Sequence, residues 1–308
     1  MIGRDPALVV TEADDRFHPP TNDDPAWIET LWFPFWVPEE GVSASVRVRI
    51  SPNAGRLEGT LAGWRGDSQG LFGDRWREAI VEPPDLVDFS TGPLRIERLE
   101  PLSRYRLRYE SERARLDLVF EAIMPPNPVS PEESPGMFAG HFEQPGRVRG
   151  ELRHGKRSHA IDCHAIRDRS WGPRHMPAEL RLGNAHGTSA SLAFFAYVNP
   201  TPDGVERITS GYLLVDGVAA AIVDGVRETT LRDGLAAAVR LEARDAAGRS
   251  LQVRGECVNT MASNAGNGVY AVLNLVRWSR LDGSDVCWGE NHDVWSEQAW
   301  LAAGRRRL

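Results

Sequence analysis

Apolar and polar residues alternate along most of this chain. In residues 42–50, Val46, Val48 and Ile50 fall on one side of an extended backbone and arginines fall on the other. The same period of two recurs in residues 94–99, 105–109 and 114–120, and runs with a helical period are scarce. Because successive side chains of a strand point to opposite faces, this pattern predicts many half-buried β-strands.

Turn-forming clusters separate these runs, for example residues 51–55 and 200–204, and the chain contains 29 glycines and 21 prolines. Even the alanine-rich segment 230–247 alternates at its centre, so we expect mostly strand there. The pattern predicts an all-β fold with few helices, in which antiparallel strands form closed or nearly closed barrels that hide their edges. The Pro-rich segment 125–135 is expected to be a surface loop or a lid over a barrel mouth.

An unusual motif occurs twice. Asp168-x-Ser-Trp-Gly-x-x-His175 is echoed by Asp285-x-Cys-Trp-Gly-x-x-His292. Two copies suggest two related halves, and the segment 177–189 is the candidate junction. We therefore expect an N-terminal β domain over residues 1–176 and a C-terminal β domain over residues 177–308.

Composition excludes several classes of function. The net charge of −7 gives no electrostatic support for nucleic-acid binding. The 3 cysteines lack a C-x-x-C spacing, which argues against a disulfide framework or a zinc–cysteine site. No apolar run is long enough for a membrane helix, and the N-terminus has no apolar signal region. We expect a cytoplasmic protein without stable membrane insertion.

Two stretches resemble a known superfamily. They are His141-Phe-Glu-Gln-Pro-Gly146 and, after a hairpin with Gly150 and Gly155, Arg167-Asp-Arg-Ser-Trp-Gly-Pro-Arg174. These residues resemble the core of the tandem lipocalin-like proteins, which include carotenoid 1,2-hydratases (hydroxyneurosporene synthases) and related terpenoid cyclases. Residues 25–30 and 51–55 resemble bacterial members of the group that have no assigned activity. The resemblance implies two tandem lipocalin-like barrels, in a group whose members hydrate an isoprenoid double bond, cyclise polyprenyl chains or have no established activity.

Asp168 and His164 are the candidate catalytic residues. On an unbroken strand they share one face with Asp162 and Ile166. An aspartic acid facing an apolar barrel would have a raised pKa and could protonate an alkene near neutral pH. Water, an internal alkene or loss of a proton would then quench the carbocation, which gives hydration, cyclisation or isomerisation. His164 and Asp168 could also form an acid–base pair.

Structural roles for the same motif stay open. Asp168 and Ser170 could fix the turn before Trp171, and Trp171 could plug the barrel with Arg174 stacked on it. The candidate substrate-binding residues are His141, Glu143, Trp171 and Arg174. His141 and Glu143 share a strand face, and His164 could join them around a metal, but their spacing departs from the cupin pattern. We therefore expect no metal and no cofactor.

Three functions follow from these patterns. The first is a cofactor-independent enzyme that hydrates, cyclises or isomerises an apolar isoprenoid- or steroid-like molecule in a barrel cavity. The second is a carrier that binds such a molecule without changing it. The third is a structural module whose barrels are filled by side chains. The expected partner is a hydrophobic small molecule, and a homodimer is left open.

Overall fold

A computed structural model describes residues 9–66, 69–134, 136–200, 205–266, 268–283 and 286–305. They form two compact units. Residues 9–64 and 70–175 make the N-terminal unit, and residues 176–305 make the C-terminal unit together with Arg65, Gly66 and Gln69. Both units are built almost entirely of strands, which confirms the all-β fold expected from the alternating pattern. Within the described residues, no helix is long and apolar enough to cross a membrane.

The N-terminal unit holds one sheet and four short 3-10 turns. Its strands are β1 (Trp27–Val37), β2 (Val42–Ser51), β3 (Arg56–Arg65), β4 (Gln69–Ala79), β5 (Asp88–Thr91), β6 (Leu94–Glu100), β7 (Arg104–Glu110), β8 (Ala114–Ala122), β9 (Asn127–Val129), β10 (Gly140–His154) and β11 (Arg157–Pro173). The turns are η1 (Glu12–Asp15), η2 (Pro38–Glu40), η3 (Pro52–Ala54) and η4 (Pro131–Glu133).

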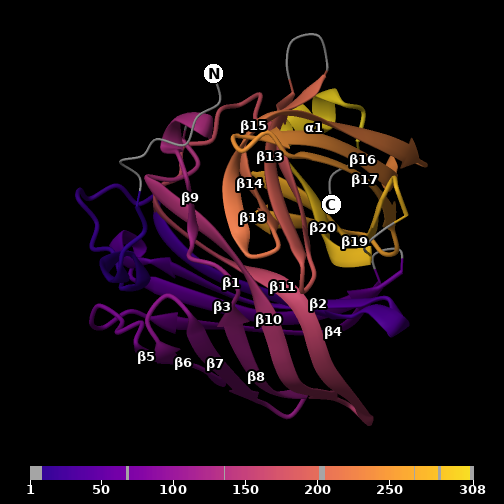
Figure 1. Ribbon diagram of the computed structural model, residues 1–308. Coiled ribbons are helices and arrows are strands. Elements are labelled where there is room, and N and C mark those ends of the chain that lie inside the picture. Colours follow the sequence, from indigo (N-terminus) through magenta and orange to yellow (C-terminus); the bar gives the residue numbers. More distant parts are fainter. Residues whose placement is uncertain are drawn as a thin grey trace. The chain divides into compact units, whose positions relative to one another are not determined.

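These strands curl into a barrel-like sheet in the order β4-β3-β2-β1-β11-β10-β8-β7-β6-β5 (Figure 1). Part of its interior is an apolar core, in which Phe33 of β1 packs against the rings of Tyr105 and Phe120 from β7 and β8. Val46 and Val48, expected on one face of β2, are fully buried. The segment 125–135, expected to be a loop or lid, contains β9, which pairs with the start of β10.

The two edge strands of this sheet meet through side chains. No backbone ladder joins β4 to β5 in the described part of the chain. Instead, the Trp76 indole of β4 donates to the Thr91 hydroxyl of β5 at 3.1 Å, and the Gly92 amide donates to Glu78 at 2.9 Å. The N-terminal barrel is therefore closed at this seam by side-chain contacts.

The C-terminal unit contains nine described strands and one helix. They are β12 (Arg181–Thr188), β13 (Leu192–Pro200), β14 (Glu206–Val215), β15 (Val218–Arg232), β16 (Leu235–Asp245), β17 (Ser250–Cys257), β18 (Met261–Gly266), β19 (Val269–Arg280), β20 (Val286–Ser296) and α1 (Glu297–Ala302). Ser296 caps the start of the helix, and its hydroxyl accepts a hydrogen bond from the Ala299 amide.

The C-terminal sheet closes on itself. Its order is β17-β16-β15-β14-β13-β12-β20-β19-β18, and β17 also pairs with β19 to complete a ring (Figure 1). Apolar side chains from these strands, including Phe194, Val276 and Trp278, fill the interior. Burying each such side chain contributes about 1.5–3 kcal/mol. The expected junction segment 177–189 is mostly the first strand of this barrel, β12.

The two barrels share a topology. β11 lies between β1 and β10, and β20 lies between β12 and β19 in the same way. The two copies of the motif therefore fall on corresponding strands. They fall at opposite ends, however: Trp171 lies opposite Glu29 near the start of β1, whereas Trp288 lies opposite Thr188 at the end of β12.

Candidate functional site

Asp168 lies near the end of β11. This strand is unbroken, so Asp168 shares a face with Asp162, His164 and Ile166 as expected. Its nearest neighbours across the sheet are Glu143 on β10 and Trp32 on β1.

That face is not the barrel interior. The core side of β11 is formed by the odd-numbered positions, where Ile161, Cys163 and Ala165 are buried in the apolar core. The expectation that Asp168 points into an apolar barrel is therefore wrong. A one-residue step along a strand reverses the direction of a side chain, and the alternating pattern alone does not say which face is inside.

The pKa of the Asp168 carboxyl lies close to neutral pH. The carboxyl is partly exposed and makes no hydrogen bond within the described residues. Desolvation by burial and the negative charge of Glu143 raise its pKa to about 7, against the pull of His141, Arg47 and Arg174. Two carboxylates directly opposite on neighbouring strands repel each other, which favours a protonated state for one of them.

His141 and Glu143 form a hydrogen-bonded pair beside Asp168. The His141 Nε2 atom lies 2.9 Å from Glu143 Oε1, and its ring stacks on Phe138 at 4.8 Å. Burial lowers the pKa of His141 to about 4, so the imidazole is neutral at pH 7. A neutral imidazole in contact with Glu143 leaves the negative charge next to Asp168 in place.

Arg174 belongs to the same neighbourhood. Its guanidinium donates a hydrogen bond of 2.8 Å to the Ser170 hydroxyl, which lies 2.7 Å from the Thr30 hydroxyl. The structure therefore brings together four of the six expected site residues: Asp168, His141, Glu143 and Arg174. Ser170 joins them through Arg174.

His164 lies apart from this group. It is directly opposite Arg147 on β10, and four residues of strand, about 13 Å, separate it from Asp168. Burial, and then the charges of Arg147 and Arg149, lower its pKa, with Asp162 opposing them. The expected His164–Asp168 pair is therefore not formed, and His164 does not join His141 and Glu143 around a common centre.

Trp171 points into the barrel. Its ring lies flat against the His18 imidazole, with centroids 3.7 Å apart and an interplanar angle of 5°. Gly140 makes room for it, because a Cβ atom there would lie 2.3 Å from the indole. The stacking partner of Trp171 is therefore His18, and the described hydrogen bond of Arg174 runs to the other face of the strand. Trp171 fits the plugging role better than contact with a substrate at Asp168.

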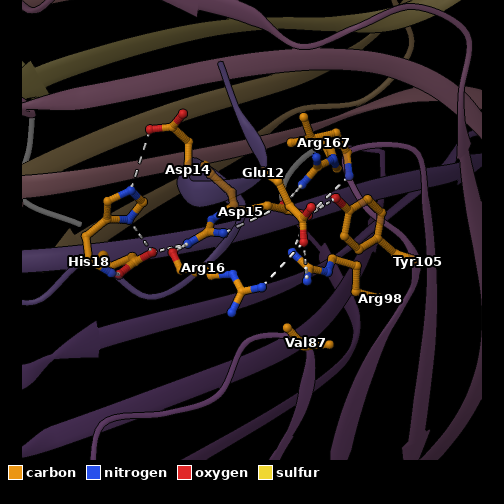
Figure 2. A network of polar contacts seen from close by, with 12 residues as sticks. Glu12, Asp14, Asp15, Arg16, His18, Val87, Arg98, Tyr105 and Arg167 are labelled. Atoms are coloured by element: carbon orange, nitrogen blue, oxygen red, sulfur yellow. Dashed lines mark hydrogen bonds and ion pairs between the residues drawn. The ribbon is translucent and has the colours of Figure 1, made fainter. Parts of the chain in front are cut away.

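Beside Trp171, the barrel interior contains a buried ionic network that the sequence did not suggest (Figure 2). Arg167 donates to Asp15 at 3.2 Å and to Gln144 at 2.7 Å. Arg169 is bound by Glu29 and lies 3.7 Å from Asp15. Asp15 of η1 and Glu29 of β1 thus supply the acids that neutralise two interior arginines.

The Asp15 carboxylate is stabilised as an anion. Burial alone would raise its pKa, but Arg167, a hydrogen bond from the Tyr105 hydroxyl, and Arg169 lower it. The same burial raises the pKa of Tyr105, which stays protonated. Each interior arginine of this network has an acidic partner, which gives the network the character of a structural element.

In the C-terminal barrel, two histidines and a glutamate gather on the face opposite to the core. His186 of β12 lies directly across from Glu290 of β20, and His292 follows two residues later. Burial opposes ionisation of Glu290, but the two imidazoles lower its pKa to about 2, so it is an anion. Of the residues that the structure describes, these three form the group that could hold a metal ion. Asp285 of the second motif lies outside the described residues.

The mouth of the C-terminal barrel holds a cavity of about 940 Å³. Its apolar lining includes Trp295, Trp300, Leu231 and Ala262. Its polar lining includes Arg227, which binds Glu206 at 2.9 Å and Asp293 at 2.6 Å, and Arg305, whose guanidinium lies over the Trp300 ring. A cavity with two indoles and a few fixed charges is suited to an apolar ligand that carries a polar group.

A family model described as "Domain of unknown function (DUF7064)" matches residues 11–294. The chain belongs to this family. The match covers both barrels, so the DUF7064 family model spans the tandem architecture. No curated protein matches the DUF7064 chain.

Several solved structures share the fold. An AttH-like protein from Nitrosomonas europaea is similar over 88% of this chain and 93% of its own, with a TM-score of 0.62 and 13% identity. Kievitone hydratase from Nectria haematococca covers 89% and 90%, with a TM-score of 0.56 and 10% identity. CghA covers 89% of each chain, with a TM-score of 0.56 and 13% identity. The tandem lipocalin-like fold expected for this DUF7064 protein is confirmed.

Some site residues of the DUF7064 chain could have been found in its sequence. Glu290 and His292 are two apart, as are His141 and Glu143, and such pairs share a strand face. Arg167 and Arg169 are odd-numbered, like the buried Cys163 and Ala165, and therefore lie on the same face of the strand. Charged side chains on a buried face need partners of opposite charge. The partners themselves, Asp15 above all, lie too far away in sequence to be paired by pattern.

Proposed function

We propose that this protein is an enzyme that hydrates, cyclises or isomerises an apolar isoprenoid- or steroid-like molecule, with Asp168 as the general acid. One observation carries the proposal: a carboxyl without a described hydrogen-bond partner, opposite a second carboxyl, has a pKa raised to about 7. Such a group is protonated in part of the population at neutral pH and is a competent proton donor.

The proposed step needs only protein groups and water. The alkene π electrons take the Asp168 proton and form a C–H bond, which leaves a carbocation and the Asp168 carboxylate. In hydration, a water oxygen bonds to the cation and its extra proton returns to Asp168. In cyclisation an internal alkene attacks the cation, and the new cation formed by this attack loses a neighbouring C–H proton to the carboxylate. In isomerisation the first cation loses a neighbouring C–H proton to the carboxylate. Each route regenerates the acid.

Two further observations support this reading. His141 is neutral and lies against Glu143, so it does not cancel the negative charge of Glu143 that raises the pKa of Asp168. One of the proteins that share the fold is a hydratase by name, kievitone hydratase. At 10% identity this likeness shows the fold, and the assignment of a reaction depends on Asp168.

The test uses acyclic and cyclic isoprenoid alkenes incubated with the full chain in D₂O, with deuterium incorporation read by mass spectrometry. Asp168→Asn keeps the shape but removes the acid, and we expect a rate loss of about 10²–10⁴-fold. Asp162→Asn is the matched control, because Asp162 shares the strand face but is exposed and paired with Arg147 at 2.6 Å. Undiminished incorporation in Asp168→Asn would overturn the proposal.

A second candidate function is binding without chemistry, and the cavity of the C-terminal barrel favours it. Its volume of about 940 Å³ suits a ligand of drug size, and its two tryptophans offer apolar contact. In this case the protein carries an apolar molecule, and no turnover depends on Asp168.

The neutral dye N-phenyl-1-naphthylamine probes this cavity. We expect a fluorescence increase on binding that Ala262→Trp abolishes, because Ala262 lines the cavity and an indole would fill it. Ala247→Trp, in an exposed turn, is the control and should bind as the wild type does. Binding that survives Ala262→Trp would place the dye elsewhere and remove support for this candidate.

A further inference from the structure

Three groups able to bind metals converge on the C-terminal barrel, on the sheet face opposite to its core. The Glu290 Oε2 atom lies 3.2 Å from His292 Nε2 and 3.6 Å from His186 Nε2. The ligand atoms of all three residues lie within 4.8 Å of one another. His186 and Glu290 are fully buried, and His292 is 9% exposed.

These separations suit a single ion. Zinc and similar ions bind imidazole nitrogen and carboxylate oxygen at about 2.0–2.2 Å, which places neighbouring ligand atoms about 3.0–3.4 Å apart. The two separations that involve Glu290 are near this value, and the ligand nitrogens of the two imidazoles lie within 4.8 Å of each other. The rings of His186 and His292 are nearly perpendicular, with an interplanar angle of 84°, so they approach the common point from different directions.

The negative charge of Glu290 also favours the binding of a cation. Glu290 is a fully buried carboxylate, and its ion-pair partners in the described residues are the two imidazoles. Its Oε1 atom is buried and makes no hydrogen bond within the same residues. A buried carboxylate of this kind is costly unless a positive charge or further donors satisfy it.

We propose that His186, Glu290 and His292 bind one divalent first-row transition-metal ion. Two imidazoles and one carboxylate suit zinc, iron or cobalt, whereas calcium and magnesium prefer sets made of oxygens. Three protein ligands leave at least one coordination position for water or a substrate oxygen. Asn184 lies directly opposite His292 on the neighbouring strand β12. Its Oδ1 atom is buried on the same face and supplies a neighbouring oxygen.

The shell around the three ligands fits such a centre. His186 stacks on Phe195, which in turn stacks on Tyr212, and both aromatic residues are buried. An apolar shell fixes ring orientation and limits solvent, which strengthens binding of an ion to its ligands. This site lies on a different barrel from Asp168, and the inference stands independently of the proposed proton transfer. It concerns other residues than His141, Glu143 and His164, on which the expectation of no metal was based.

The experiment removes metals from the full chain with a chelator and then adds Co²⁺, followed by its visible absorption, or Zn²⁺, followed by calorimetry. We expect one equivalent of either ion to bind and to raise the melting temperature, since an ion that binds only the folded state stabilises it. Glu290→Gln, which keeps the side-chain shape, and His292→Ala should each weaken this binding at least tenfold.

His141→Ala is the matched control, because His141 and Glu143 are also two apart and in contact, at 2.9 Å, but belong to the other barrel. It should retain the full equivalent of metal. Circular dichroism confirms that each variant is folded, and Glu290→Gln alone decides the matter if His292→Ala does not fold. A wild-type chain that binds neither ion, or an equivalent of metal that survives Glu290→Gln, would overturn the proposal.

Discussion

Arg167 and Asp168 are consecutive residues of β11, yet their side chains meet opposite electrostatic environments. Arg167 points into the N-terminal barrel, where Asp15 and Gln144 bind its guanidinium. Asp168 points to the other face, where its direct neighbour on β10 is the like-charged Glu143. The inner charge is neutralised by close partners, and the outer acid is pushed towards its neutral form.

The contrast separates charges that hold the fold from charges that are available for chemistry. Burial acts on both faces, but partners inside the barrel lower the pKa of Asp15, whereas burial and Glu143 raise the pKa of Asp168. Removing one partner of a buried ion pair destabilises the fold, because it leaves the other charge buried and uncompensated. A group held away from its preferred charge state stores free energy that a reaction can use. The predictions below test this division.

The largest effect is expected from Asp15→Ala. The variant leaves Arg167 buried without an acid, and losing one partner of a buried pair costs about 3–5 kcal/mol. Urea denaturation measures the loss. Glu12→Ala, in the same 3-10 turn but about half exposed, should cost under about 1 kcal/mol. Equal effects of the two variants would mean that the interior network is not what stabilises this end of the barrel.

The outer face should respond to pH with the opposite sign from the inner one. Because the pKa of Asp168 rises from 3.8 to about 7, the folded protein keeps a proton that the unfolded chain releases between these values. Stability from this group therefore falls as pH rises from about 4 to 7, by at most about 4 kcal/mol. Asp15 has a lowered pKa, so its contribution is lost as pH falls below its ordinary value.

The free energy of unfolding of the wild type minus that of Asp168→Asn, measured against pH, isolates the first trend. We expect this difference to decline between pH 4 and 7 and to be flat above. A difference that is flat throughout would show that Asp168 has an ordinary pKa and would weaken its assignment as an acid.

The C-terminal barrel extends the comparison, because its interior arginine has two acidic partners where Arg167 has one. Arg227 has two acids, Glu206 and Asp293, so Asp293→Asn leaves it paired. We expect a loss of about 1.5–3 kcal/mol, the value of a hydrogen bond to a charged group, which is less than for Asp15→Ala. Asp224→Asn, in an exposed pair with Arg244, is the control for urea denaturation and should be nearly neutral. A cost above that of Asp15→Ala would contradict this reading.

The smallest effect concerns the close approach of Gly140 to Trp171. In Gly140→Ala the new methyl group would lie 2.3 Å from the indole and would push the ring off His18. Overpacking of this kind costs about 1–3 kcal/mol. The melting temperature measures it, and Gly73→Ala, where a Cβ meets nothing within 4 Å, serves as the control.

Part of this picture follows from the sequence alone. The period of two predicted the strands, and Val46 and Val48 predicted a buried face of β2, because strand geometry links neighbours of equal parity. The shared face of Asp162 and Asp168 was predicted for the same reason. The superfamily resemblance, based on residues 137–175, predicted the tandem barrels.

The inside and outside of β11 could not be predicted in this way. Arginines at 167 and 169 mark the buried side, which reverses the usual polarity, and the acid that explains Arg167 is 152 residues away. His186 and Glu290 likewise meet only because β12 pairs with β20. Pairings between distant strands depend on the whole fold, and no local periodicity encodes them.

The seam between β4 and β5 has a consequence for engineering. Residues 80–87 connect two strands that share side-chain contacts but no ladder in the described residues, whereas the C-terminal ring is completed by β17 and β19. A chain break or an inserted domain at residues 81–85, between the backbone hydrogen bonds of Ile80 and Val87, would leave the hydrogen-bonded order from β3 through β6 intact. The N-terminal barrel therefore offers a fusion point, or new chain ends for circular permutation, where no ladder of the described sheet would be broken.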